Sequence, residues 1–374
     1  MVDAGNVYRL GIKELWSLVR DPLLLGLIVY AFTAAIYTAA TAMPETLNNA
    51  AIAIVDEDRS PLSGRIASAF YPPHFTRPAM ITLEELDAGL DSGEFTFALV
   101  VPAGFQRDLL AGRRPEIQLN VDATRMAQAF AGNGAIQQIA MGEVDEFLQG
   151  HRFAAALPVE LALRMRFNPG LDRSWFGGIM EIISIVTMLS IALTGAALIR
   201  ERERGTIEHL LVMPVTPTEI MLSKLWSMGL VVLIATALSL TFVIQGLLQV
   251  PITGSVWLFV LLAGLHLFST TSLGIFLATM SRTMPQFALL VILTLFPMQI
   301  LSGAVTPRES MPDAVATVML AAPMTHFVTG SQAILYRGAG LPVVWPQLIA
   351  ILVIGGVFFA IAHARFRKAL VQMA

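Results

Sequence analysis

The sequence predicts a polytopic α-helical membrane protein with six transmembrane helices. The chain of 374 residues is 55% hydrophobic and only 14% charged, and its mean hydropathy is +0.69, which is far from the composition of a soluble enzyme. Several uninterrupted apolar runs are long enough to cross a bilayer. One long stretch, 44–174, contains no such run. We therefore expect it to form a separate periplasmic α/β domain inserted between transmembrane helices 1 and 2.

The amino-terminal segment, residues 1–22, is amphipathic. Its apolar side carries Tyr8, Ile12, Leu15, Trp16 and Val19, and its polar side carries Arg9, Lys13, Glu14 and Arg20. This pattern predicts a cytoplasmic elbow helix lying in the membrane interface. The apolar run 23–43 follows and is long enough to form transmembrane helix 1. A cleaved signal peptide is the alternative, because Ala40-Thr41-Ala42 resembles a cleavage site, but the apolar run is longer than is usual for one.

The 44–174 stretch alternates short apolar runs with helical patterns, as α/β domains do. We expect strands over 50–55, 95–101 and 116–121, and helices over 62–70, 83–90, 105–111 and 125–149. Acidic side chains outnumber basic ones in the whole stretch. Asp56-Glu57-Asp58 is either a cation site or a solvated turn before a helix that starts at Ser60, and its place directly after a strand favours the turn.

Five further spans are expected within 175–366, as transmembrane helices 2–6, and a cytoplasmic tail over 367–374. They are Trp175–Ile199, Leu225–Val250, Trp257–Met280, Met284–Val305 and Val344–Ala362. An even number of spans puts both termini on one side. The segments on that side carry Arg9, Lys13, Arg20, Arg200, Arg202, Arg204, Lys224, Arg282, Arg365, Arg367 and Lys368, whereas the short loops opposite carry only Arg308 and Arg337. This bias predicts an inner (plasma) membrane protein with both termini in the cytoplasm.

A dense island of charge, Arg200–Pro214, separates the second apolar run from the third. Charged side chains are costly at bilayer depth, so this island lies outside the membrane while its flanks cross it. Ile207, Leu210 and Leu211 fall on one face at helical spacing. We expect a short amphipathic helix over 201–213. It is either a membrane-surface anchor or a lever that presses on a partner, and the lack of an energy-supplying motif in this chain favours the lever.

The segment 306–340 is too apolar for an ordinary loop. Its prolines divide it into two half-length helices, Asp313–Ala322 and Thr325–Tyr336. Neither helix could span a bilayer, so we expect a re-entrant pair between helices 5 and 6, buried against protein.

Several kinds of chemistry are missing from the sequence. The chain has no cysteine, which excludes disulfides and thiolate catalysis. It has no G-x-x-x-x-G-K-[ST] motif and only three lysines, so it cannot hold ATP phosphates by the P-loop mechanism. Glu208-His209 is the only near match to a zinc-protease motif, and Gly205 replaces the first histidine. A net charge of −3 argues against nucleic-acid binding. We expect no catalytic residue, no metal site and no enzyme activity.

A few polar groups fall at membrane depth, where polar side chains are functional candidates. Glu181, Thr187 and Gln299 are candidates for lining a transport pathway. Pro297 is a candidate hinge in the fifth span, with a purely structural kink as the alternative. Helix packing is the alternative for the hydroxyl groups, because rows of Ser and Thr commonly join transmembrane helices.

Four features combine along the chain: the amphipathic amino-terminal helix ending in Arg20-Asp21-Pro22, the large α/β loop, the charged insert and the proline-rich segment. The most telling stretches are Glu201–Pro214 (E-R-E-R-G-T-I-E-H-L-L-V-M-P) and Leu301–Pro312 (L-S-G-A-V-T-P-R-E-S-M-P), and Ile334–Gly338 and Gly104–Asp108 support them. Together they resemble the permease subunits of the type-2 ABC exporter family, and most closely its YhhJ-like subgroup. The resemblance runs essentially from end to end.

This resemblance implies a dimer of two six-span permease subunits, identical or different, over two ABC ATPase subunits. ATP and Mg²⁺ would be bound on the ATPase, and this chain would bind no cofactor directly. Coupling to the ATPase is implied for Glu201, Arg202, Glu203, Arg204, Gly205, Thr206, Glu208 and His209. An outer gate is implied for the re-entrant pair with Pro307, Pro312 and Pro323. A periplasmic adaptor of the membrane-fusion type is a further implied partner.

The predicted function is therefore the permease subunit of an ATP-driven exporter that moves a drug-like or lipid-like molecule out of the cytoplasm or inner membrane. One alternative is a membrane-anchored periplasmic receptor or scaffold. Another is an ion-coupled secondary transporter, but such folds usually have paired broken helices, and Met284–Val305 is the only span that we expect a proline to interrupt. The sequence does not identify the cargo, the second permease subunit or an outer-membrane channel.

Overall fold

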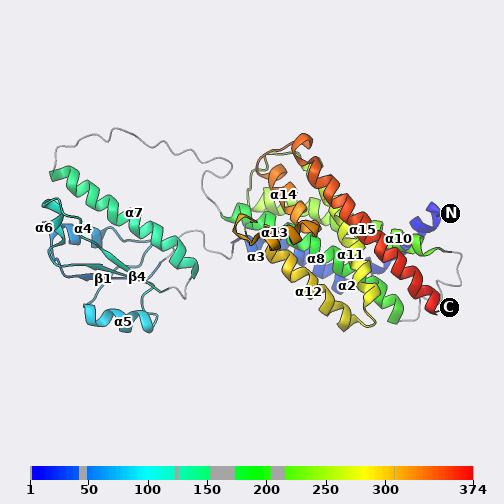
Figure 1. The fold of residues 1–374 in the computed structure, drawn as a ribbon, viewed down its shortest axis with the longest axis horizontal. Coiled ribbons are helices and arrows are strands. Elements are labelled where there is room, and N and C mark those ends of the chain that lie inside the picture. The colour runs from blue at the N-terminus through cyan, green and yellow to red at the C-terminus, as the bar shows by residue number, and fades with distance from the viewer. Residues whose placement is uncertain are drawn as a thin grey trace. The chain divides into compact units, whose positions relative to one another are not determined.

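The computed structural model describes residues 2–41, 49–122, 126–151, 173–203, 215–306 and 308–373. Contacts divide the chain into two compact units, and Figure 1 shows both. One unit is Pro44–Arg164 and contains the sheet. The other combines Met1–Met43 with Met165–Ala374 and is helical. We call them the inserted unit and the helical unit.

The inserted unit is an α/β fold around a four-stranded sheet. Its elements are β1 (Ile52–Asp56), α4 (Pro61–Ser68), β2 (Ala79–Met80), α5 (Leu83–Asp91), β3 (Phe97–Val101), α6 (Phe105–Leu110), β4 (Gln118–Val121) and α7 (Met126–His151). The strand order is β2-β1-β3-β4. β1 runs parallel to both neighbours, and β4 runs antiparallel to β3. The expected strands and helices are all present, and the two-residue β2 is an addition that the sequence did not indicate.

Both faces of the central strands are covered, as the apolar residues of β3 and of β1 up to its last residue, Asp56, require. Ile54 and Leu99 point to the face that packs against α4, α6 and α7. Val55 and Val100 point to the opposite face, where Leu86 of α5 packs. The acidic run after β1 forms a turn: Asp56 accepts hydrogen bonds from the Arg59 backbone and the Ser63 hydroxyl, at 2.8 and 2.9 Å. Ser60 caps α4, so the turn interpretation is the one that the structure supports.

The helical unit begins with α1 (Ala4–Val19), which packs against α10. The elements that follow are α2 (Pro22–Tyr30), the π-helical η1 (Ala31–Ala35), α3 (Ile36–Thr41), α8 (Arg173–Glu203), α10 (Pro217–Ser239), the π-helical η2 (Leu240–Leu247), α11 (Val256–Met280), α12 (Met284–Leu301), η3 (Arg308–Ser310), α13 (Asp313–Val318), η4 (Met319–Ala321), α14 (Pro323–Leu335) and α15 (Leu341–Met373). The two chain ends lie at the same end of this unit (Figure 1).

Six helices among the described residues are long and apolar enough to cross a membrane. They are Pro22–Thr41, Ser174–Glu203, Pro217–Leu247, Val256–Met280, Met284–Leu301 and Leu341–Lys368. The predicted polytopic helical protein is confirmed. A further apolar pair, Asp313–Ala321 and Pro323–Leu335, bends by 92° and forms either a broken crossing or a re-entrant loop.

α11 forms the centre of the helical unit and packs against α8, α10, α14 and α15. Its middle turns carry hydroxyl groups that are buried, including Thr270. Thr270 accepts a hydrogen bond of 2.6 Å from Ser190 of α8. Polar pairs of this kind join transmembrane helices where apolar packing alone has little driving force.

Two helix boundaries differ from the sequence-based expectation. α8 does not end at Ile199 but continues through Glu203, because Arg and Glu are good helix formers and nothing in that turn stops a helix. α15 begins at Leu341 and contains Pro346, so Met284–Leu301 is not the only span with an internal proline. Pro346 is the sixth residue of its helix, so it lacks the N–H that would otherwise bond to the carbonyl four residues earlier.

Candidate functional site at the charged end of α8

The last turn of α8 connects to four different segments of the helical unit. We call Arg200, Glu201, Arg202 and Glu203 the charged turn. Arg200 pairs with Asp21 at 3.5 Å, and Glu201 pairs with Lys224 of α10 at 2.8 Å. The Nη1 of Arg202 donates to the Ser281 carbonyl at 2.6 Å, just after α11. Glu203 accepts a hydrogen bond of 2.9 Å from the Met284 backbone at the start of α12.

The charged turn therefore ties one end of α8 to the junction before α2, to the first half of α10, and to the junction between α11 and α12. Asp21 has a second role, because its side chain also accepts from the Leu24 backbone at 3.2 Å and caps α2. Pro22 follows at the first helical position, where proline is favoured.

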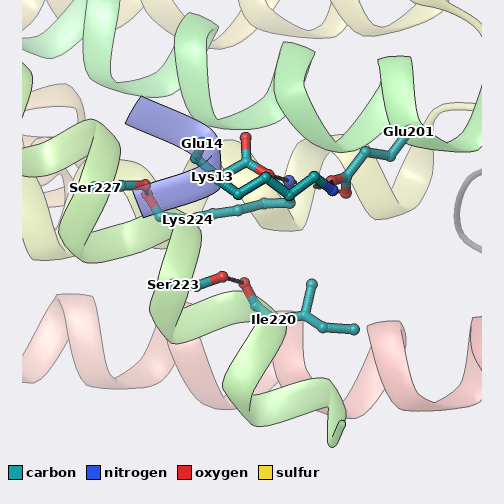
Figure 2. A network of polar contacts seen from close by, with 7 residues as sticks. All are labelled: Lys13, Glu14, Glu201, Ile220, Ser223, Lys224 and Ser227. Carbon is teal, nitrogen blue, oxygen red and sulfur yellow. Dashed lines mark hydrogen bonds and ion pairs between the residues drawn. The ribbon is translucent and has the colours of Figure 1, made fainter. Parts of the chain in front are cut away.

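Lys224 is buried between two carboxylates (Figure 2). Its side chain is 2% exposed, and its Nζ lies 2.9 Å from Glu14 of α1 and 2.8 Å from Glu201. Lys13, which is 58% exposed, approaches Glu201 at 3.9 Å. We call these four residues the Lys224 cluster. An unpaired buried ammonium would be strongly unfavourable, and the two carboxylates compensate it.

The electrostatics of the cluster affect Glu14. Burial alone would raise the pKa of this carboxyl, but the Lys224 ammonium opposes that effect and holds the pKa of Glu14 below its ordinary value. Glu14 is therefore ionised at neutral pH. α1 is attached to the bundle by a charge-assisted contact rather than by apolar packing alone.

Local sequence signals explain why α1 docks on α10. Thr216 and Glu219 form a capping box that starts α10. The same Glu219 carboxylate accepts a hydrogen bond of 2.7 Å from the Asp3 backbone, directly before α1. Farther along, the Trp226 ring lies against Gly11, and a side chain at Gly11 would overlap that ring. The indole N–H of Trp226 also donates to the Val7 carbonyl at 3.1 Å.

The remaining coupling candidates, Arg204, Gly205, Thr206, Glu208 and His209, lie outside the described residues, as does most of the predicted helix 201–213. The structure adds Glu14 and Lys224, which we did not select from the sequence. A signal for Lys224 was present: it is one of three lysines in the chain, and it stands at the edge of an apolar run. Its partners are remote, since Glu14 is 210 residues away.

Thr187 lies inside the bundle. It is fully buried, and its hydroxyl forms a hydrogen bond of 2.8 Å with Nε2 of His266. The His266 ring stacks on Phe327 with 4.1 Å between centroids. These contacts join α8, α11 and α14. Within this chain Thr187 faces other helices and not an open surface.

Gln299 lines a groove of about 480 Å³ between α8 and α12. Met188 and Ala192 contribute from α8, and Ala288 contributes from α12. Pro297 lies within α12 and is exposed in this chain. Glu181 is a half-buried residue of α8 that is not among those lining the groove. The structure therefore does not bring the pathway candidates together at one place.

Two of the three gate candidates mark the starts of helices. Pro312 precedes α13, and Pro323 is the first residue of α14. Pro307 lies outside the described residues. α14 is largely buried, packing against α8, α11 and α15, whereas no residue of α13 is buried.

The helical unit and the α/β unit inserted between its first two membrane-capable helices define a polytopic membrane protein. The chain matches the ABC-2 family transporter protein model over residues 17–364 and belongs to this family. It is 59% identical over 369 residues to the inner membrane transport permease YhhJ of Escherichia coli (strain K12), covering 99% of both chains, and equally similar to that of Shigella flexneri. It is 28% identical over 359 residues to the probable multidrug ABC transporter permease YbhR of Escherichia coli (strain K12), covering 95% of this chain and 96% of that one. The family resemblance found in the sequence is confirmed.

Proposed function

We propose that this chain is the membrane-spanning subunit of an ATP-driven exporter in the inner membrane, and that it moves a drug-like or lipid-like molecule out of the cytoplasm or the membrane. The relatives support this proposal, since they are named transport permeases and one is named a probable multidrug permease. The observation that carries it is the charged turn, which ties α8 to four other segments. A mechanical connection of this kind suits a subunit that receives force from a partner.

In the proposed mechanism an ABC ATPase subunit docks on the segment 201–213 at the cytoplasmic face. The ATPase holds ATP and Mg²⁺, and its closure displaces the segment. Because Arg202 and Glu203 are bonded to the junction between α11 and α12, the displacement reaches those helices together with α8. The Lys224 cluster carries the same displacement to α1 and α10.

The pathway itself requires a second permease subunit, identical or different. We assign the groove beside Gln299 to the surface that faces this subunit, because it is an apolar, open hollow on α8 and α12 with a polar group at its edge. The bent pair of helices between α12 and α15 would form the outer gate, with both chain termini in the cytoplasm and the inserted unit in the periplasm. A periplasmic adaptor of the membrane-fusion type is the partner that we assign to the inserted unit.

The test is purification of the chain from its native membrane in mild detergent, followed by identification of co-purifying proteins and measurement of ATP hydrolysis. We expect an ATPase subunit to co-purify. The double substitution Glu203→Ala with Arg204→Ala should weaken the coupling of ATP hydrolysis to transport while leaving membrane insertion intact. Wild-type transport by the double variant at equal expression would remove the lever assignment, and transport by the chain without any ATPase would support an ion-coupled transporter instead.

A further inference from the structure

The inserted unit contains a cavity that the proposed transport mechanism does not use. Its volume is about 380 Å³, within the range of about 300–1,000 Å³ that small-molecule sites occupy. Leu99 of β3 and Leu119 of β4 line it from the sheet. Phe105 lines it from α6, and Ile136 and Ala140 line it from α7. The lining is therefore apolar and comes from four elements of one domain.

The cavity exists because the helices do not cover this part of the sheet completely. α6 has only 6 residues and ends at Leu110. β4 is the edge strand of the sheet, so no further strand pairs with its outer side among the described residues. On the α7 side, Ala140 is a small residue facing the opening. A short helix, a sheet edge and a small side chain together leave the space unfilled.

Two arginines stand at the cavity and are placed there by the end of α6. Gly112 adopts a left-handed conformation with φ +75°. Its N–H donates to the Leu109 carbonyl at 3.0 Å, and the Arg113 N–H donates to the Asp108 carbonyl at 2.9 Å. This is the Schellman arrangement, which reverses the chain after a helix. Arg113 and Arg114 follow immediately and both line the cavity.

The charge at the cavity is positive. Asp108 is shared between Arg107 and Arg113, at 3.0 and 3.5 Å, so one carboxylate faces two guanidinium groups. Arg114 forms no ion pair or hydrogen bond with any other described residue. This arrangement contrasts with the acidic composition of the surrounding domain. An apolar cavity with guanidinium groups beside it is complementary to a molecule with an apolar body and one anionic end.

We propose that this cavity binds a single-chain amphipathic carboxylate, such as a medium-chain fatty acid. The hydrocarbon chain lies against Leu99, Leu119 and Ile136, and the carboxylate pairs with Arg113 and Arg114. A nucleotide or another polyanion does not fit, because the rest of the lining offers almost no hydrogen-bonding groups. The inference is independent of the direction of transport and of the ATPase.

The experiment uses the full chain in lipid nanodiscs and a decanoate analogue with a diazirine near its methyl end. After photolysis, labelled peptides are mapped by mass spectrometry. We expect labelling of peptides that line the cavity, and competition by decanoate but not by decanol. The double variant Arg113→Gln with Arg114→Gln should label roughly fivefold less, and Ala140→Leu, which fills the cavity, should also reduce labelling.

The matched control is Arg77→Gln, an exposed arginine of the same domain that does not line the cavity. It should label like the wild type. The proposal is overturned if the cavity peptides remain unlabelled, if decanol competes as well as decanoate, or if the double arginine variant labels like the wild type. Because Arg113 and Arg114 are exposed, this variant remains informative even if Ala140→Leu fails to fold.

Discussion

Lys224 is the single residue whose removal should disturb the charged end of the bundle most. Lys224→Gln would leave Glu14 and Glu201 buried near each other without the ammonium that compensates them. We expect the free energy of unfolding to fall by about 3–5 kcal/mol, as measured by chemical denaturation in detergent. Lys13→Gln is the matched control, because Lys13 is 58% exposed, and it should cost about 1 kcal/mol or less. Equal losses in the two variants would show that Lys224 is not the centre of the cluster.

Glu14 gives the same cluster a dependence on pH. Its pKa in the folded chain lies below the ordinary value of 4.5, so its ion pair adds stability that is fully present above that value and is lost as the pH falls through the folded pKa. The difference in stability between the wild type and Glu14→Gln should therefore be constant at neutral pH and shrink on acidification below about pH 4.5. Denaturation midpoints of both proteins across this range provide the measurement. A difference that grows toward acid would contradict the assignment.

At the scale of elements, α1 is held to α10 at a place where only glycine fits. Any side chain at Gly11 overlaps the Trp226 ring, so Gly11→Leu should lift α1 away from α10. We expect trypsin to cut after Lys13 roughly tenfold faster, because proteolysis follows the population of the opened state. Gly26→Leu is the control, since nothing lies within 4 Å of a Cβ at Gly26. Unchanged cleavage of the Gly11 variant would mean that α1 does not depend on this contact.

Most helices and strands could be predicted from the sequence, because each depends on the order of apolar and polar residues within its own segment. Apolar runs located all six membrane-capable helices, and Ser60 marked the start of α4 through its capping box. What the sequence did not show depends on distant partners. Arg200–Glu203 were expected to leave the membrane helix, yet they extend it, as their helix propensity allows. Their partners Asp21, Lys224, Ser281 and Met284 come from elsewhere in the chain. No local signal reports such pairing.

The same distinction applies to the candidate site. Glu201, Arg202 and Glu203 were selected because charge between two spans must lie outside the bilayer, and this local argument needs no structure. Thr187 shows the limit, because its position at membrane depth was visible in the sequence while its bond to His266 was not. The cavity of the inserted unit was also invisible in the sequence, since it arises where the short α6, the sheet edge at β4 and the small Ala140 of α7 meet.

At the scale of the whole molecule, the central claim is that an ATPase drives this chain through the charged turn. Because the chain has no cysteine, a single Ala288→Cys places one thiol in the groove beside Gln299. The thiolate reacts with N-ethylmaleimide far faster than the thiol does, and it forms only where water is present. The reaction rate of this cysteine therefore reports whether water reaches the groove. Leu289→Cys, at a position 67% exposed in the single subunit and outside the groove lining, is the control.

The decisive measurement compares this reaction rate in the purified complex with its ATPase, before and after trapping with ATP and vanadate. We predict that trapping changes the reaction rate of the thiol at Ala288→Cys but not of the thiol at Leu289→Cys. Adding Arg202→Ala, which releases the charged turn from Ser281, should abolish the change. Adding Arg282→Ala should leave the change intact. An unchanged rate on trapping, or the same change in the chain without its ATPase, would contradict the account.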